Sequence, residues 1–282
     1  MAAAKKKRKE RKTAAVAPAR TPREDVRRRL REEVGFGCPV EGCGSPYLEY
    51  HHFDPPWHEG KTHHEPGMIA LCIKHHAQAD QGAWTKDQLR ALKRPTPEVL
   101  RGRFNWMRER IVGVVGGNAC VDVPVLVRYR DTPMIWFNWD DAGHMLLNVR
   151  MASKQDVETL GLIDNDWIVG KRAPQDLVCP PSGKKVEIRY ANGDYLKVEF
   201  TEVESVSETK GDIAKLSPAL LAHIEFPAVI AQISFAVGGT PIVFGPAVAK
   251  LGNAAVVSGG YAEGVEYGLT WTEHSTRFGS NI

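Results

Sequence analysis

The histidines and cysteines of this chain are concentrated in one short window, which constrains the fold more than any other feature. Seven of the ten histidines lie between His51 and His76, and three of the five cysteines (Cys38, Cys43 and Cys72) lie in or beside that span. Imidazole and thiolate are the usual protein ligands of transition metals, and imidazole also titrates near neutral pH. The window therefore predicts a site that binds metal and moves protons.

Positive charge is concentrated at the N-terminus. Residues 1–31 contain thirteen Lys and Arg against three Asp and Glu, a local charge of +10, so the total of +3 leaves −7 for residues 32–282. Residues 1–20 have almost no large apolar side chains, so we expect a disordered tail. Its charge predicts a polyanionic partner. The candidate nucleic-acid contacts in this tail are Lys5, Lys6, Lys7 and Arg8.

A helix is expected directly after the tail. Thr21-Pro22-Arg23-Glu24 matches a capping box with proline in the first turn, the helical pattern continues to Glu33, and Gly35 ends it. The arginines of this helix form either a solvated face or, because the tail has the same sign, a nucleic-acid surface. Arg27 and Arg28 are the candidate contacts.

Length and composition are those of a globular protein of about two domains. The chain has 282 residues, of which 43% are hydrophobic and 25% charged. No run reaches about 18 apolar residues, the length of a membrane span, so no membrane partner is expected. The Lys-rich start lacks the apolar segment of a secretory signal. Cysteines that are odd in number and grouped with histidines favour a reducing compartment, and we expect a cytoplasmic protein.

Local patterns predict short elements around the window. Residues 36–55 indicate a hairpin or knuckle, residues 73–81 a short helix ended by Gly82, and Thr85 caps a helix that continues to about Lys93. Thr96-Pro97-Glu98 then predicts the start of another helix. The apolar residues that recur there at helical spacing are Leu100, Phe104, Met107 and Ile111, and they indicate a core stripe rather than a cofactor site.

Beyond Gly113–Gly117 the patterns become those of strands. Alternation over residues 121–129 and a hairpin over residues 134–150 are expected. In the hairpin over residues 184–200, a two-residue Asn-Gly turn would place the two apolar sets on opposite faces. A three-residue loop with Gly193 in the left-handed conformation places them on one face. We therefore expect the pairs Ile188 with Leu196 and Val186 with Val198.

Four residues of the window have the spacing of a structural zinc site. Cys38 and Cys43 form a C-x4-C pair, and Cys72 and His75 form a C-x2-H pair. Two such pairs supply the four N/S ligands of a closed tetrahedral site, which contributes folding energy to a small domain. The alternative is a set of buried, unligated cysteines. The other two cysteines, Cys120 and Cys179, lack such neighbours and are expected in the core.

His51, His52, His76 and Asp80 remain as candidate catalytic residues. If residues 73–81 are helical, His76 and Asp80 share one face at i and i+4 and can bind one cation. His51 and His52, adjacent on a strand, point to opposite sides unless the strand ends there, as Pro55 and Pro56 indicate. One of them can then face a metal while the other takes a different role.

Two segments of the window together resemble a known family. Leu-Glu-Tyr-His-His-Phe-Asp-Pro, followed by Met-Ile-Ala-Leu-Cys-x-x-His-His-x-x-x-Asp-x-Gly, resembles the HNH endonuclease domain, the ββα-metal nuclease fold, over roughly residues 34–95. The resemblance implies one divalent cation (Mg²⁺, Mn²⁺ or Ni²⁺) held by a hairpin and a helix. It implies His52 as the general base and His51, His76 and Asp80 as ligands of the cation.

The sequence departs from that family at Gly67, where members commonly have Asn. The missing side chain usually orients the catalytic loop or contacts the metal. His58, His63 or His64 could compensate, although a place on the loop surface is the simpler expectation for these three histidines.

The resemblance implies hydrolysis of DNA phosphodiester bonds, with a 5′-phosphate and a 3′-hydroxyl as products. A neutral imidazole can take a proton from water, and a cation can stabilise the leaving 3′ oxygen. The partner is then DNA, held by the tail in a salt-dependent way, and the family allows a homodimer or a larger assembly. The alternative is a non-catalytic zinc-ribbon-like nucleic-acid-binding protein, which explains the zinc residues but not His52, His76 and Asp80.

The expected fold class is α+β. A zinc-stabilised ββα-metal HNH domain with flanking helices occupies residues 21–112, after the tail of residues 1–20. A mostly β domain of unknown role, which could recognise a trigger, a partner or the substrate, occupies residues 118–282.

Overall fold

The computed structural model describes residues 19–95, 99–151, 160–169, 174–252, 255–272 and 275–281. Strands hold 41% of these residues and helices 17%. The expectation of an α+β chain built on a ββα-metal HNH domain is therefore wrong, and the chain is mostly β. One reason is that residues 101–103 and 112–115, around the expected last helix of the N-terminal half, instead form strands of two large sheets.

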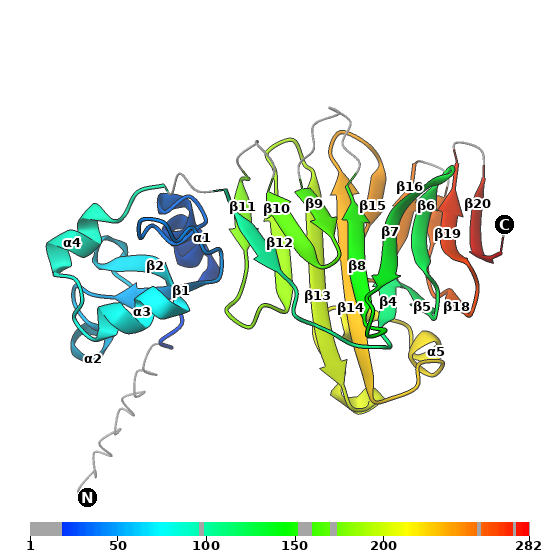
Figure 1. The fold of residues 1–282 in the computed structure, drawn as a ribbon, viewed down its shortest axis with the longest axis horizontal. Coiled ribbons are helices and arrows are strands. Elements are labelled where there is room, and N and C mark those ends of the chain that lie inside the picture. The colour runs from blue at the N-terminus through cyan, green and yellow to red at the C-terminus, as the bar shows by residue number, and fades with distance from the viewer. Residues whose placement is uncertain are drawn as a thin grey trace, which may run out of the picture.

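The N-terminal elements form a small unit around a two-stranded sheet (Figure 1). In chain order they are α1 (Glu24–Glu33), β1 (Leu48–His52), α2 (Trp57–Gly60), the 3-10 helix η1 (Glu65–Gly67), β2 (Met68–Cys72), α3 (Ile73–Asp80) and α4 (Lys86–Ala91). β1 and β2 are antiparallel, with His52 opposite Met68 and Leu48 opposite Cys72. This unit has its own apolar core, which includes Leu30, Ile69 and Leu71.

Eight strands form the first large sheet. Across it they are β20 (Thr276–Ser280), β19 (Tyr267–Trp271), β6 (Val125–Tyr129), β7 (Thr132–Trp139), β8 (Met145–Arg150), β9 (Leu160–Ile163), β10 (Asp166–Val169) and β3 (Arg101–Arg103). Neighbouring strands are antiparallel except for β19 beside β6, which are parallel.

Ten strands form the second large sheet. Its main path is β11 (Asp176–Val178), β12 (Lys185–Arg189), β13 (Tyr195–Val203), β14 (Ala228–Val237), β15 (Ile242–Phe244), β16 (Ala249–Leu251) and β17 (Ala255–Val257). β4 (Val112–Val115) joins β14 in parallel, and β5 (Asn118–Val121) and β18 (Tyr261–Glu263) extend that branch. The remaining helices are η2 (Val206–Glu208), η3 (Ile213–Lys215) and α5 (Pro218–Leu221).

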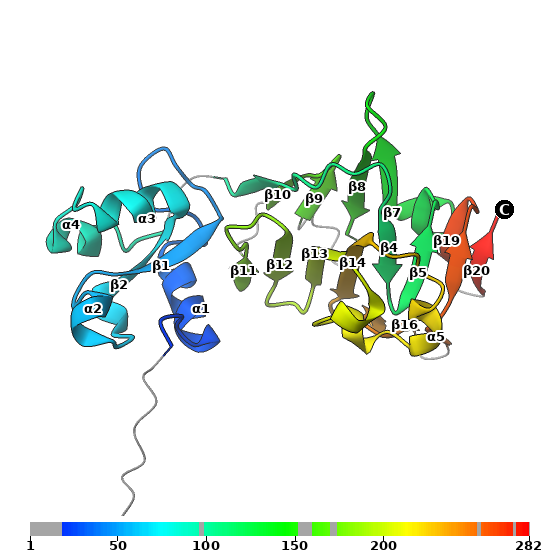
Figure 2. The same cartoon turned by 90° about the horizontal axis from the view of Figure 1, so that it is seen from below.

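The two large sheets lie in two layers with the main apolar core between them (Figure 2). Phe104, which follows β3, packs edge-on against Phe200 of β13 at 5.1 Å between ring centroids, and Trp106 stacks on the same ring. Burial of each such side chain contributes about 1.5–3 kcal/mol. A smaller core packs α5 and η3 against β4 and β14.

Several local predictions are confirmed. The hairpin of β12 and β13 has the expected register, with Ile188 opposite Leu196 and Val186 opposite Val198, and Gly193 has φ +88°. The helix over residues 73–81 forms as α3. The capping box at Thr85 forms with both of its hydrogen bonds to Gln88.

One predicted helix forms as α1 but with a wrong start, and another predicted helix does not form. α1 begins at Glu24 after Arg23, and no side chain caps it, so the capping box at Thr21 does not form. Residues 96–98 lie outside the described residues, but the segment after them contains β3 and no helix through residue 111. Phe104 and Ile111 are nevertheless buried, as expected of a core stripe, because the sheets cover them. The division into domains stays a prediction.

Arg31 connects the N-terminal unit to the second sheet. Its guanidinium donates to both carboxylate oxygens of Asp176 in β11 at 2.9–3.1 Å and to the Tyr50 hydroxyl at 2.7 Å, and it is only 2% exposed. Glu24 accepts a further hydrogen bond from it. Close by, Tyr47 forms a β-bridge with Cys179. Arg31 therefore lies apart from the solvated face expected of this helix. Within the described residues, no helix is long and apolar enough to cross a membrane.

We predict that Asp176→Ala destabilises the protein by about 3 kcal/mol, because it leaves the Arg31 charge buried with fewer partners. Urea unfolding measures the change. Asp166→Ala is the matched control, because its ion pair with Arg103 is exposed and is worth less than about 1 kcal/mol. Equal losses in the two variants would contradict the role of Arg31.

Candidate metal centre and active site

Three cysteines and one histidine converge where β2 passes into α3. Cys38 and Cys43 lie on the loop after α1, whose turn is closed by hydrogen bonds from the Cys38 amide to Ser45 and from the Cys43 amide to Val40. Cys72 ends β2 and is the N-cap residue of α3, and His75 lies in the first turn of that helix. The helical turn brings the thiol of Cys72 and the ring of His75 together.

The distances in this cluster match a tetrahedral metal site. The Sγ atoms of Cys43 and Cys72 are 3.8 Å apart, and His75 Nδ1 lies 3.2 Å from Cys38 Sγ and 3.4 Å from Cys72 Sγ. Around zinc, with Zn–S near 2.3 Å and Zn–N near 2.0 Å, ligand atoms are about 3.5–3.8 Å apart. The four residues could therefore hold a metal ion such as zinc.

The thiols of this cluster differ in pKa. A hydrogen bond from Cys38 lowers the pKa of Cys72 to about 5, and the same bond raises the pKa of Cys38. Burial raises the pKa of Cys43. A thiolate is the form that binds metal. By contrast, burial raises the pKa of Cys120 to about 12, and both Cys120 and Cys179 lie in the core as expected.

A second cluster lies where β1 contacts α3. His51 Nδ1 is 3.1 Å from one carboxylate oxygen of Asp80, and His76 Nδ1 is 3.3 Å from the other. The two imidazole rings meet edge to face at 5.2 Å. Burial and the neighbouring His76 lower the pKa of His51. Two imidazoles and a carboxylate, with ligand atoms within 4.8 Å of one another, could hold one cation.

Glu49 is a neighbour of this cluster that sequence reasoning missed. Its carboxylate lies 3.8 Å from His76 Nδ1. Glu49 precedes His51 by two residues in β1, so the two side chains leave the same face of the strand. The strand period of two was the signal that could have identified it.

His52 faces away from that cluster, as expected for adjacent strand residues. Its ring lies 5.1 Å from the ring of Trp57, and its Nε2 is 3.1 Å from His63 Nδ1. Burial, followed by the nearby His63 and Arg20, lowers the pKa of His52 to about 4. The ring is therefore neutral at neutral pH and can accept a proton.

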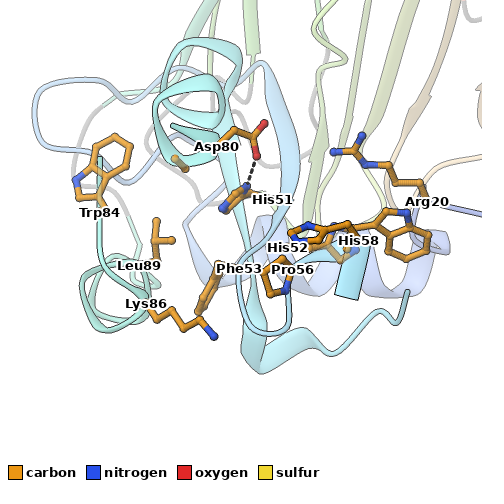
Figure 3. Close-up of a pocket in the computed structure, with 12 residues that line it drawn as sticks. Arg20, His51, His52, Phe53, Pro56, His58, Asp80, Trp84, Lys86 and Leu89 are labelled. Atoms are coloured by element: carbon orange, nitrogen blue, oxygen red, sulfur yellow. Dashed lines mark ion pairs between the residues drawn. The ribbon is translucent and has the colours of Figure 1, made fainter. Parts of the chain in front are cut away.

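His51 and His52 both line a pocket of about 470 Å³. Figure 3 shows the ion pair of His51 with Asp80 on one side, and Arg20 and Lys86 at opposite edges. The lining combines aromatic, basic and acidic side chains: Arg20, His51, His52, Phe53, Pro56, Trp57, His58, Ala79, Asp80, Trp84, Lys86 and Leu89.

The expected loop-surface position holds for His64, whereas His58 is at the surface but within α2, and the expectation is wrong for His63. His58 and His64 are exposed. His63 is half-buried, contacts His52 and stacks on Trp57 at 5.1 Å. No periodic pattern marks His63, because its place depends on how the loop folds back.

The structure explains the glycine that departs from the family pattern. A Cβ added at Gly67 would lie 1.6 Å from the carbonyl oxygen of Asp54. The Gly67 carbonyl in turn accepts hydrogen bonds from the amides of Phe53 and Asp54, directly after β1. Asn cannot replace glycine here without moving the segment that follows His52.

The candidate nucleic-acid contacts are only partly placed. Lys5, Lys6, Lys7 and Arg8 lie outside the described residues. Arg27 forms an ion pair with Glu24 in the first turn of α1, and Arg28 is exposed. A contact of any of them with DNA stays a prediction.

Comparisons with protein-family models, with curated proteins and with solved structures found no match to this chain. Function must therefore be inferred from the chemistry of the two clusters and the pocket.

We predict that the purified protein carries about one zinc ion per chain, and that Cys43→Ser loses it and lowers the melting temperature. Native mass spectrometry measures the metal, and circular dichroism measures melting. Cys120→Ala is the matched control, since it removes a buried thiol outside the cluster. Full zinc content in Cys43→Ser would rule out this ligand set.

Proposed function

We propose that the protein is a metal-dependent endonuclease of the HNH type that hydrolyses phosphodiester bonds in DNA. The observation that supports this most is that two adjacent histidines of β1 point in opposite directions and so meet different neighbours. His51 faces a carboxylate and a second imidazole, whereas His52 faces away from them, and both line the same pocket. A cation site and a base are then held next to each other by one strand.

His51, His76 and Asp80 would hold the catalytic cation, and Cys38, Cys43, Cys72 and His75 a structural zinc. When bound, a divalent cation supplies charge neutralisation at the scissile phosphate and at the leaving 3′ oxygen. Imidazole ligands favour transition metals over Mg²⁺. We therefore expect Mn²⁺ or Ni²⁺ to support activity at lower concentration than Mg²⁺.

His52 acts as the general base. Its neutral ring takes a proton from water as the water oxygen forms a bond to phosphorus. The bond between phosphorus and the 3′ oxygen breaks, and that oxygen takes a proton from solvent. The products are a 5′-phosphate and a 3′-hydroxyl.

Basic groups around the pocket would hold the DNA backbone. Arg20 and Lys86 border the pocket, and Arg20 is the last residue of the tail with its excess of positive charge. Contacts of Lys and Arg with phosphates give affinity without sequence preference and weaken as salt rises.

We predict that His52→Ala lowers the rate of plasmid nicking about 10²- to 10⁴-fold, because the base is removed. Supercoiled plasmid is incubated with the full chain and Mg²⁺, Mn²⁺ or Ni²⁺, and nicked product is quantified on gels, with EDTA as the metal-free control. His144→Ala is the matched control, because it removes a histidine from the β7–β8 turn.

Two results would reject the proposal: no nicking with any of the three metals, or nicking by His52→Ala at the wild-type rate. If the wild-type protein binds DNA and carries zinc but never cleaves, the non-catalytic zinc-ribbon-like alternative replaces the nuclease.

We predict that alanine at Lys5, Lys6, Lys7 and Arg8 weakens DNA binding and flattens its salt dependence. Loss of four phosphate contacts reduces the slope of log affinity against log salt by up to about 4. Fluorescence anisotropy with labelled duplex measures both quantities. The matched control replaces four exposed cations of the β-rich half, Lys184, Lys210, Lys250 and Arg277. An equal effect of the two sets would contradict a specific role of the tail.

A further inference from the structure

A chain of hydrogen-bonding groups runs from the start of the described chain to His52. The carbonyl oxygen of Ala19 lies 3.0 Å from His63 Nε2, and His63 Nδ1 lies 3.1 Å from His52 Nε2. These contacts join three segments of the N-terminal unit: the end of the tail, the loop after α2, and the end of β1.

When both rings are neutral, the chemistry of these groups fixes where each proton lies. A carbonyl oxygen can only accept, so His63 Nε2 carries a proton and donates it to Ala19. A neutral imidazole has one protonated nitrogen, so His63 Nδ1 is an acceptor. His52 Nε2 must then donate to it, which leaves the lone pair of His52 on Nδ1.

Neighbouring groups hold this arrangement in place. Trp57 stacks on the ring of His63, with 21° between the planes, and also contacts the ring of His52. Lys61, in the left-handed conformation after α2, turns the chain back so that His63 returns to β1. His63 is thus held by an aromatic face on one side and by a backbone carbonyl on its outer nitrogen.

We propose that His63 is a positioning residue that holds His52 in the tautomer with the proton on Nε2, and that Ala19 sets the tautomer of His63. Nδ1 of His52 is then the nitrogen that takes the proton from water. This proposal rests on the proposed function for its catalytic consequence, but the tautomer itself can be measured without activity.

Long-range proton–nitrogen NMR of the full chain, labelled with nitrogen-15 histidine and without added divalent cation, reports the tautomer of each ring. The His52 signals are assigned by their loss in His52→Gln. We expect a protonated Nε2 and an unprotonated Nδ1 for His52, and a protonated Nε2 for His63. A proton on Nδ1 of His52 in the wild-type protein overturns the proposal.

Two variants of similar size separate positioning from packing. His63→Leu keeps an apolar contact with Trp57 but offers no acceptor, so His52 should become a mixture of tautomers. We expect kcat for nicking to fall about 10- to 100-fold with KM unchanged. His63→Asn places an oxygen where Nδ1 stands, and it should restore the tautomer and most of kcat. Zinc content checks that both variants fold.

The outcomes distinguish this proposal from the nuclease assignment. If His63→Leu loses activity while the His52 spectrum is unchanged, His63 has only a structural role and the proposal fails. If His63→Leu keeps both the spectrum and the wild-type rate, the proposal fails as well. Wild-type nicking by His52→Ala rejects the general base instead, whatever the tautomer of the ring.

Discussion

The passage from β2 into α3 at Cys72 is the constraint on which the candidate site depends. Cys72 closes the pairing of β2 with β1, caps α3 and belongs to the cysteine–histidine cluster at once. A helix of eight residues has little stability of its own, so its direction must come from tertiary contacts. Ligation at Cys72 and His75 would supply them. The same helix carries His76 and Asp80, so a fixed first turn also fixes their approach to β1.

The alternation of side chains along β1 then places His51 and His52 in two different environments. The side chains of adjacent residues leave a strand on opposite faces, so His51 meets α3 and His52 meets the loop after α2. The short segment that follows His52 is held by Gly67, where a backbone carbonyl occupies the space of a side chain. The family's Asn therefore has no room here. A loop histidine, His63, contacts the proposed base instead, at 3.1 Å between His63 Nδ1 and His52 Nε2.

The sequence was informative where structure is local and less so where it depends on distant partners. The β12–β13 register followed from alternation and one glycine, and the four proposed zinc ligands followed from two spacings. The apolar stripe containing Phe104 has helical spacing, yet its burial comes from Phe200, nearly a hundred residues later. Val112–Val115 likewise forms a strand because β14 lies beside it. No local pattern contains that information. The position of His63 could not be predicted for the same reason, since its contacts with Trp57 and Ala19 determine it.

The contact of the N-terminal unit with the second sheet also depends on partners that are distant in sequence. Asp176 accepts three of the hydrogen bonds of the buried Arg31 guanidinium, and loss of one partner of such a buried pair costs several kcal/mol. The pair therefore forms only when α1 and β11 are both folded and in contact. Because α1 also packs on β1 and β2, this contact lies next to the strand that carries His51 and His52. The β-rich half thus contacts the N-terminal unit through the buried Arg31–Asp176 pair and through Tyr47, which directly precedes the proposed catalytic strand and bridges to Cys179.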